Sequence, residues 1–199
     1  MTLGPEYFDR LYQQDTDPWK FRTRWYEARK RQMTMAALPD EHYPSVFEPG
    51  CSIGLLTRLL AARSDRVLAM DTSAAALRQA QTSVPDHVQL RKGTVPDDWP
   101  SGRFDLVVLS ELGYYLDEKD CQQLATQAVT SAADLIAVHW RHPVEDYPLT
   151  GDHVHQIMDQ TAAAHGLACI CHHAETDFRL AVWSRDHRSV ASRAGLIPT

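Results

Sequence analysis

Residues 48–54 read E-P-G-C-S-I-G, a glycine-containing turn between two apolar segments. Val46 and Phe47 precede it with the character of a strand end, and the leucine-rich run 55–62 that follows has helical spacing. A glycine at a strand end lets a ligand approach the backbone closely, and the free N–H groups that open a helix favour an anion or a carboxylate. The turn therefore predicts a small-molecule site between a strand and a helix.

The spacing of this turn differs from the dinucleotide fingerprint G-x-G-x-x-G. Gly50 matches its first position, but Ser52 and Leu55 occupy the other two. Glu48 would lie unfavourably near a pyrophosphate, whereas a cationic ligand suits a carboxylate there. We therefore expect S-adenosylmethionine, which carries an ammonium and a sulfonium and no phosphate, and Ser52→Gly should leave its affinity nearly unchanged. A nicotinamide-dependent oxidoreductase and a cofactor-free binding module are the alternative functions.

The rest of the chain alternates between strand-like and helix-like segments. Seven segments have the character of strands: 46–47, 66–71, 88–91, 104–111, 134–140, 167–174 and 178–185. Strands that alternate with helices imply right-handed crossovers and a mostly parallel sheet, and the last two strands lie close enough for an antiparallel hairpin. The sequence thus predicts an α/β fold whose ligands bind at the carboxyl ends of the strands.

The whole-chain composition favours a soluble globular protein. The 199 residues are 44% hydrophobic and 23% charged, and the net charge of -6 argues against a dedicated nucleic-acid partner. No apolar run reaches the roughly 18 residues of a membrane span, and MTLGPEYFDR does not resemble a secretory signal, so we expect a cytoplasmic location and no membrane partner. We expect no metal, because the cysteines have neither zinc nor disulfide spacing: Cys51, Cys121, Cys169 and Cys171.

Two helices precede the glycine turn. Pro5 suits the first turn of one helix, and residues 22–38 form a second that ends before Pro39. Six basic residues crowd positions 20–31, either as a solvated helix face or with one member that binds an anionic ligand group. We expect one domain over 1–199, in which 1–44 form a helical lid, 45–186 the catalytic core and 187–199 a tail.

The strand ends carry the candidate chemistry. Asp71 ends the strand 66–71, where its carboxylate could accept hydrogen bonds from both ribose hydroxyls or serve as a charge at the following helix N-terminus. Glu111 ends the strand 104–111 and is the candidate for positioning cofactor or acceptor. His139 ends the strand 134–140 and is the candidate base, with a buried core histidine as the alternative. Tyr115 either packs or stacks on a sugar.

These motifs in this order resemble those of class I S-adenosylmethionine-dependent methyltransferases: E-P-G-C-S-I-G, Met70-Asp71 and F-D-L-V-V-L-S-E. Four shorter words resemble the nodulation protein S group: D-P-W at 17–19, W-Y-E-A-R-K-R at 25–31, S-E-L-G-Y-Y-L at 110–116 and H-W-R-H-P at 139–143. The resemblance implies a Rossmann-like three-layer sandwich with strand order 3-2-1-4-5-7-6, the last strand being antiparallel. It also implies N-methylation of the amine of an amino sugar or chitooligosaccharide-like small molecule, with S-adenosylhomocysteine as the product.

The resemblance and the strand ends together define a candidate site. The candidate catalytic residues are Glu111, His139 and Tyr115. The candidate cofactor-binding residues are Trp19, Arg31, Glu48, Gly50, Cys51, Ser52, Gly54, Asp71, Thr72, Thr94, Val95 and Glu111. The sequence departs from the family pattern twice, because it has no acid at 93–95 to meet an adenine amino group and Ala132-Ala133 in place of a glycine pair.

Overall fold

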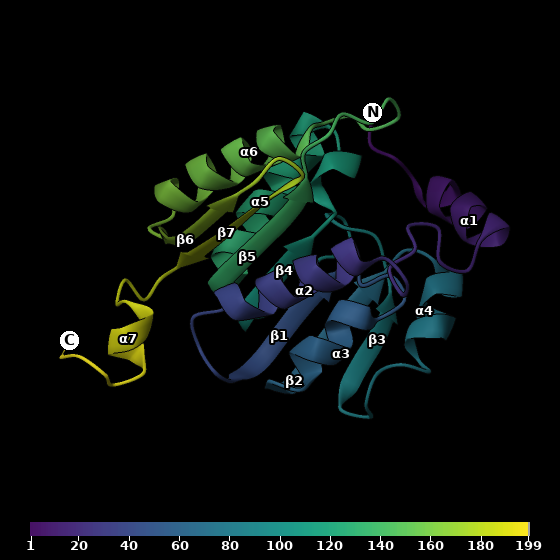
Figure 1. Ribbon diagram of the computed structural model, residues 1–199. Helices are drawn as coiled ribbons and strands as arrows, with labels where there is room; N and C mark the ends of the chain where they lie inside the picture. Colours follow the sequence, from purple (N-terminus) through teal and green to yellow (C-terminus); the bar gives the residue numbers. More distant parts are fainter. Residues whose placement is uncertain (199) are drawn as a thin grey trace.

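The computed structural model describes residues 1–198 and contains one seven-stranded sheet (Figure 1). Its strand order is β3-β2-β1-β4-β5-β7-β6, and β7 alone runs antiparallel to its neighbours β5 and β6. The strands are β1 (Tyr43–Pro49), β2 (Ser64–Asp71), β3 (Val88–Lys92), β4 (Phe104–Ser110), β5 (Ala132–Trp140), β6 (Ala168–Ala174) and β7 (Phe178–Ser184). This order confirms the fold that the sequence predicts.

Helices cover both faces of the sheet (Figure 1). They are α1 (Pro5–Gln14), α2 (Trp25–Ala37), α3 (Leu55–Ala61), α4 (Ala74–Ala80), the 3₁₀ turn η1 (Gly113–Tyr115), α5 (Glu118–Ser131), α6 (Gly151–Ala164) and α7 (Val190–Arg193). On β4, Leu106 and Val108 pack in the cluster that includes the leucines of α3, whereas Val107 and Leu109 pack with α5 and α6. Because successive side chains of a strand point to opposite faces, a strand buried on both faces reads as a continuous apolar run.

The junctions between elements explain one difference from the sequence predictions and one departure from the family pattern. The second helix begins at Trp25 and not at residue 22, because the Asp17 carboxylate accepts the N–H groups of Phe21 and Arg22 and stabilises a turn there. Ala132 follows α5 directly with extended backbone (φ -93°, ψ 145°), so the junction has no left-handed position that would require glycine.

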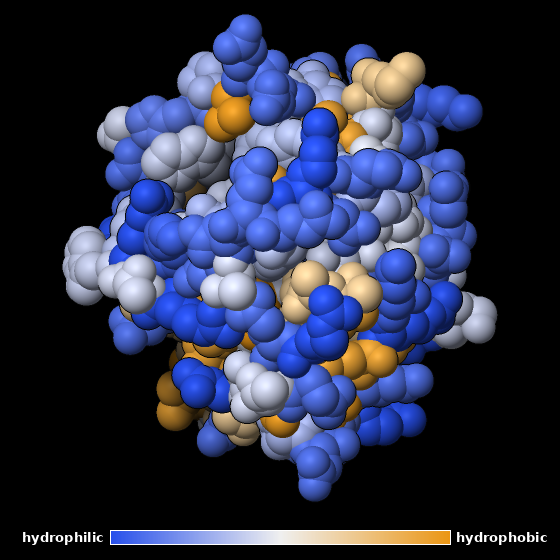
Figure 2. All heavy atoms as spheres, turned by 90° about the vertical axis from the view of Figure 1, so that its right-hand side faces the viewer, coloured by the Kyte–Doolittle hydropathy of each residue, from blue (hydrophilic) through white to orange (hydrophobic). Residues whose placement is uncertain are grey.

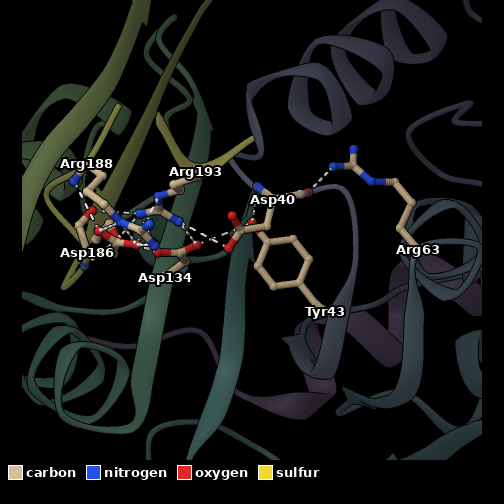
Figure 3. Close-up of polar contacts among 8 residues, drawn as sticks. Asp40, Tyr43, Arg63, Asp134, Asp186, Arg188 and Arg193 are labelled. Carbon is tan, nitrogen blue, oxygen red and sulfur yellow. Dashed lines mark hydrogen bonds and ion pairs between the residues drawn. The ribbon is translucent and has the colours of Figure 1, made fainter. Parts of the chain in front are cut away.

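The C-terminal segment is anchored to the amino-terminal edge of the sheet (Figure 3). Arg193 on α7 forms an ion pair of 3.0 Å with Asp134 at the start of β5, and the two side chains are only 5% and 4% exposed. Asp134 also accepts hydrogen bonds from the hydroxyls of Tyr43 and Ser184. The predicted tail thus contains the short docked helix α7, and Thr199 lies outside the described residues.

The described part of the chain has neither a membrane-spanning helix nor a cluster of metal-ligating side chains. None of its helices has the length and apolar character needed to cross a membrane. Within residues 1–198, no three His, Cys, Asp or Glu side chains converge in a way that could hold a metal ion.

Candidate active site

A cavity lies at the carboxyl ends of β1 to β4, the edge of the sheet at which the sequence predicts a ligand. Strand ends form one side, and residues of α1, α2 and the loop between them form the other. The space between its lining residues is about 1080 Å³, a volume that includes the part open to solvent. The outer face that carries α1 and α4 is mostly hydrophilic, with hydrophobic atoms in small patches (Figure 2).

The turn after β1 has three residues in the left-handed region: Gly50 (φ 73°), Ser52 (φ 53°) and Gly54 (φ 78°). Gly50 lines the cavity, and a side chain there would come within 3.3 Å of Leu112. Gly54 does not line the cavity. A Cβ at this position would lie 3.0 Å from that of Ala80, so Gly54 lets α3 pack against α4.

Two buried carboxylates border this turn. The Asp71 carboxylate accepts the N–H groups of Ser52 and Ser73, each at 2.8 Å, and burial raises its pKa to about 6. Glu48 is 2% exposed, and burial raises its pKa to about 8. Among the described residues, the Oε2 atom of Glu48 has no hydrogen-bond partner. An unpaired buried carboxylate is unfavourable, so a cation placed against Glu48 would be stabilised.

The loop after β3 closes the far end of the cavity. Thr94 and Val95 line it, and the Thr94 hydroxyl shares a hydrogen bond of 3.1 Å with that of Thr72. The Thr94 N–H group donates to the Asp98 carboxylate at 2.8 Å. Asp98 is exposed and stabilises this loop from outside the cavity. It therefore does not take the place of the acidic residue that the family pattern has at 93–95 and this sequence lacks.

The N-terminal segments form the second wall of the cavity. The Tyr12 hydroxyl hydrogen-bonds the Ser52 hydroxyl, which joins α1 to the glycine turn. Trp19 lies in the cavity wall, packed edge-on against Tyr12 and stacked on Phe21. Arg31 also lines the cavity, and no described residue forms an ion pair with its guanidinium. Its fork of donors therefore remains available for a carboxylate.

A buried ion cluster connects α2 to the end of β4. The Lys30 ammonium lies 2.8 Å from Oε1 of Glu111 and 3.1 Å from Oε2 of Glu27, and all three residues line the cavity. Lys30 is 4% exposed and Glu27 is 8% exposed. Desolvation lowers the pKa of Lys30, but the two carboxylates outweigh it and the pKa is raised. Lys30 therefore stays charged between two acids.

Glu111 is held in a strained conformation. Its φ of 55° lies in the left-handed region, which side chains other than glycine rarely adopt. Oε2 accepts hydrogen bonds from the Tyr114 hydroxyl and from the Trp140 N–H group at 3.2 Å. With Lys30 on Oε1, the carboxylate is fixed from three directions at the cavity wall.

His139 does not lie where a substrate base is required. The side chain is fully buried and absent from the cavity wall, and its Nε2 accepts the N–H group of Gly113 at 3.1 Å. Nδ1 lies 3.3 Å from Nε2 of His155, and burial lowers the pKa of His139 to about 3. The structure thus places the candidate base outside the cavity wall, in the position of the alternative, a buried histidine that orders η1.

The structure thus gathers most of the candidate site at one cavity. Twelve of the predicted residues line it: Trp19, Arg31, Glu48, Gly50, Cys51, Ser52, Asp71, Thr72, Thr94, Val95, Glu111 and Tyr115. Gly54 and His139 do not. Sequence reasoning missed Tyr12, Glu27 and Lys30. A signal existed for the last two, because residues 27, 30 and 31 share one helical face in a segment already noted for its charge.

The polar groups of the cavity fit S-adenosylmethionine. Glu48 supplies a buried carboxylate oxygen, Oε2, for a cationic group, and Arg31 supplies a guanidinium without an ion-pair partner among the described residues for a carboxylate. Asp71 retains lone pairs for hydroxyl donors beside its two backbone hydrogen bonds. The ligand supplies an electrophilic methyl group, whereas these residues would bind and orient it.

Sheet order, glycine turn and the acid after β2 define a class I S-adenosylmethionine-dependent methyltransferase. A family model described as nodulation protein S (NodS) matches residues 8–138, well over half of the chain. The chain belongs to this family. It is therefore an enzyme that takes its methyl group from S-adenosylmethionine and releases S-adenosylhomocysteine. The family match favours this activity over the alternative of a nicotinamide-dependent oxidoreductase.

Solved structures agree with this assignment. A candidate methyltransferase from Pseudomonas syringae has 40% sequence identity and a TM-score of 0.71, over 81% of this chain and 100% of that chain. The N-methyltransferase NodS from Bradyrhizobium japonicum WM9, in complex with S-adenosylhomocysteine, has a TM-score of 0.77 at 20% sequence identity. The match covers 89% of this chain and 96% of that chain. The DhpI complex with S-adenosylhomocysteine has a TM-score of 0.72 at 17% sequence identity, over 92% of this chain and 96% of that chain. The latter two share the fold, and no curated protein sequence matches the chain significantly.

Proposed function

We propose that this protein transfers a methyl group to the free amine of a small molecule, and that the acceptor is an amino sugar. The observation that carries this proposal is the cluster of Glu27, Lys30 and Glu111 in the cavity wall. Two carboxylates face one ammonium there, so the cluster has one negative charge in excess. A buried wall of that charge favours a cationic acceptor such as an ammonium over a carboxylate.

Three further features support an amino sugar. The related NodS from Bradyrhizobium japonicum WM9 is itself named an N-methyltransferase. Aromatic side chains of Phe8, Trp19 and Tyr115 line the cavity, and their rings offer apolar surfaces for the C–H faces of a sugar. The Tyr115 hydroxyl lies 3.3 Å from that of Tyr147, a hydrogen bond that fixes the Tyr115 ring in the cavity wall.

Within this proposal the candidate residues have separate roles. Arg31 binds the cofactor carboxylate, Glu48 supports its cationic part and Asp71 binds the ribose hydroxyls. Glu111 positions the reacting groups from the end of β4. Alignment of donor and acceptor is the main contribution that a protein makes to such a displacement.

A labelled methyl-transfer screen tests the proposal. Glucosamine should accept the methyl group and N-acetylglucosamine should not, because the amide nitrogen lacks a free lone pair. Simple amines and carboxylates complete the panel. A rise in melting temperature with S-adenosylhomocysteine but not with NAD serves as the control for a folded, binding-competent protein. Transfer to carboxylates with none to any amine would contradict the proposal.

A further inference from the structure

Glu27 occupies a distinctive position on α2. With Lys30 and Arg31 it forms one helical face, at the i, i+3 and i+4 positions, and that face lines the cavity. Its two carboxylate oxygens lie 3.3 Å and 3.1 Å from the Lys30 ammonium. The side chain is buried, yet it borders the space that a ligand would enter.

The two acids of the cluster differ in how many hydrogen bonds they accept. Glu111 accepts hydrogen bonds from Tyr114 and Trp140 at Oε2 and forms an ion pair with Lys30 at Oε1, so its orientation is determined from three sides. Within the described chain, Glu27 accepts from Lys30 alone. A carboxylate has about four lone-pair positions, so Glu27, which is held by Lys30 alone, retains acceptor capacity at the cavity wall. Glu111, by contrast, is fixed by Tyr114, Trp140 and Lys30.

We infer that Glu27 binds the acceptor ammonium and takes its proton before methyl transfer; this inference rests on the proposed amine substrate. In that step an N–H bond of the ammonium breaks, its electron pair stays on nitrogen, and the proton forms an O–H bond with a Glu27 oxygen. The nitrogen lone pair is then free for the methyl group that S-adenosylmethionine supplies. Glu27 returns the proton to solvent when the products leave.

The charged groups around Glu27 suit this exchange. Burial raises the pKa of Glu27, while Lys30 lowers it, Glu111 raises it again and Arg31 lowers it to a smaller extent. The net result is an acid with a raised pKa, closer to that of an amine, as proton transfer between the two requires. The Lys30 ammonium faces both oxygens of Glu27, and Tyr26 covers this ammonium on the helix side.

Calorimetry of acceptor binding tests the proton transfer without turnover. Glucosamine is titrated into the complex with S-adenosylhomocysteine, below the pKa of the amine, in two buffers of different ionisation enthalpy. The wild-type protein should bind the ammonium with almost no net proton release. Glu27→Gln should accept only the neutral amine and release about one proton to the buffer. Equal proton release by the two proteins would overturn the inference.

The pH dependence of methyl transfer gives an independent test. Below the pKa of the amine, Glu27→Gln should lower kcat/KM roughly 100-fold, the lower end of general-base effects. The deficit should shrink as rising pH supplies the neutral amine directly. Glu27→Asp should keep the wild-type profile at a reduced rate, and Glu41→Gln, an exposed acid, should change nothing.

These experiments separate the two proposals. A wild-type protein that binds S-adenosylhomocysteine but neither binds nor methylates any free amine would overturn both. A wild-type protein that methylates glucosamine, with a Glu27→Gln deficit that is constant across pH, would overturn the role of Glu27 alone. If each variant in complex with S-adenosylhomocysteine melts at the same temperature as the wild-type complex, its cavity is intact.

Discussion

The hydroxyl of Tyr12 in α1 hydrogen-bonds the hydroxyl of Ser52 in the turn after β1, so the N-terminal wall of the cavity is joined to the glycine turn. Tyr12→Phe removes this bond and leaves the backbone unchanged. S-adenosylhomocysteine should then bind about 2- to 10-fold more weakly, since a neutral hydrogen bond contributes ~0.5–1.5 kcal/mol. Isothermal titration calorimetry measures the change, and an unaltered affinity would show that α1 does not depend on this contact.

Ser52→Gly breaks the same hydrogen bond but has a compensating effect. The φ of 53° at Ser52 is strained for any residue with a Cβ, by about 1–2 kcal/mol, and glycine removes that strain. The affinity for S-adenosylhomocysteine should therefore fall less than in Tyr12→Phe. This refines the sequence expectation of a nearly unchanged affinity. A larger loss than in Tyr12→Phe would mean that the Ser52 hydroxyl contacts the ligand itself.

Glu48→Gln should stabilise the ligand-free protein at high pH. Burial raises the pKa of Glu48 from 4.5 to about 8, so the folded state binds more protons than the unfolded chain between these values. Wild-type stability attributable to Glu48 is therefore present below 4.5 and is lost as pH rises through about 8. Glutamine does not ionise, so the variant should exceed wild type by a margin that grows over this window.

Denaturant unfolding of ligand-free wild type and Glu48→Gln at several pH values measures that margin. The same substitution should weaken the binding of S-adenosylmethionine, because a neutral amide attracts a cation less than a carboxylate does. Ligand-free stabilities that stay parallel across the window would contradict an unpaired, buried Glu48.

Arg31→Met should weaken binding of S-adenosylhomocysteine roughly 10-fold or more, because a charge-assisted hydrogen bond contributes ~1.5–3 kcal/mol. Methylthioadenosine lacks the amino acid part, so its affinity should be nearly unchanged in the same variant. Arg24→Met is the matched control, since Arg24 is exposed on the same segment. Equal losses for the two ligands would show that Arg31 acts on the adenosine part or on the fold.

The strands and most helices were predictable because their signals are local. The run 104–111 is apolar throughout, and β4 occupies Phe104–Ser110 with both faces covered. Ser73 and Asp117 stand where helix caps are expected, and their side chains accept the N–H groups of Ala76 and Asp120. Such patterns need no knowledge of the rest of the chain.

The buried charges were not predictable in the same way. Lys30 belongs to a basic run that is typical of a solvated face, and its burial depends on Glu111, which comes from the distant end of β4, as well as on the neighbouring Glu27. His139 ends a strand, as candidate bases do, but η1 places the Gly113 N–H group against its ring and separates it from the cavity. Both outcomes depend on contacts between segments far apart in sequence.

His139→Leu should destabilise the protein by about 1–3 kcal/mol, because the buried Gly113 N–H group loses its acceptor. His139→Gln should lose less, since its carbonyl oxygen can reach the position of Nε2. Methyl transfer at neutral pH should persist in His139→Gln, as expected of a residue that orders η1. Loss of kcat with unchanged stability would restore the candidate base.

The free energy of unfolding at acidic pH gives a second test of the role of His139. The pKa of His139 falls from 6.5 to about 3 on burial, so the folded state binds fewer protons than the unfolded chain in that window. Its contribution is present above 6.5 and is lost as pH falls toward about 3. His139→Gln should flatten this pH dependence in part, since His155, whose pKa burial lowers to about 2, titrates in the same direction.

Arg193→Met should destabilise the fold without affecting the cavity. Arg193 and Asp134 are both buried, so removing the guanidinium leaves an uncompensated carboxylate and should cost about 3–5 kcal/mol in urea unfolding. Asp134→Asn combined with Arg193→Met should recover part of that loss. Arg188→Met, which removes an exposed pair with Asp186, should change stability by about 1 kcal/mol or less. Asp134 lies near the start of β5, whereas the cavity lies at the carboxyl ends of the strands. The folded variants should therefore bind S-adenosylhomocysteine as wild type does, and a weakened affinity would show that the two edges are coupled.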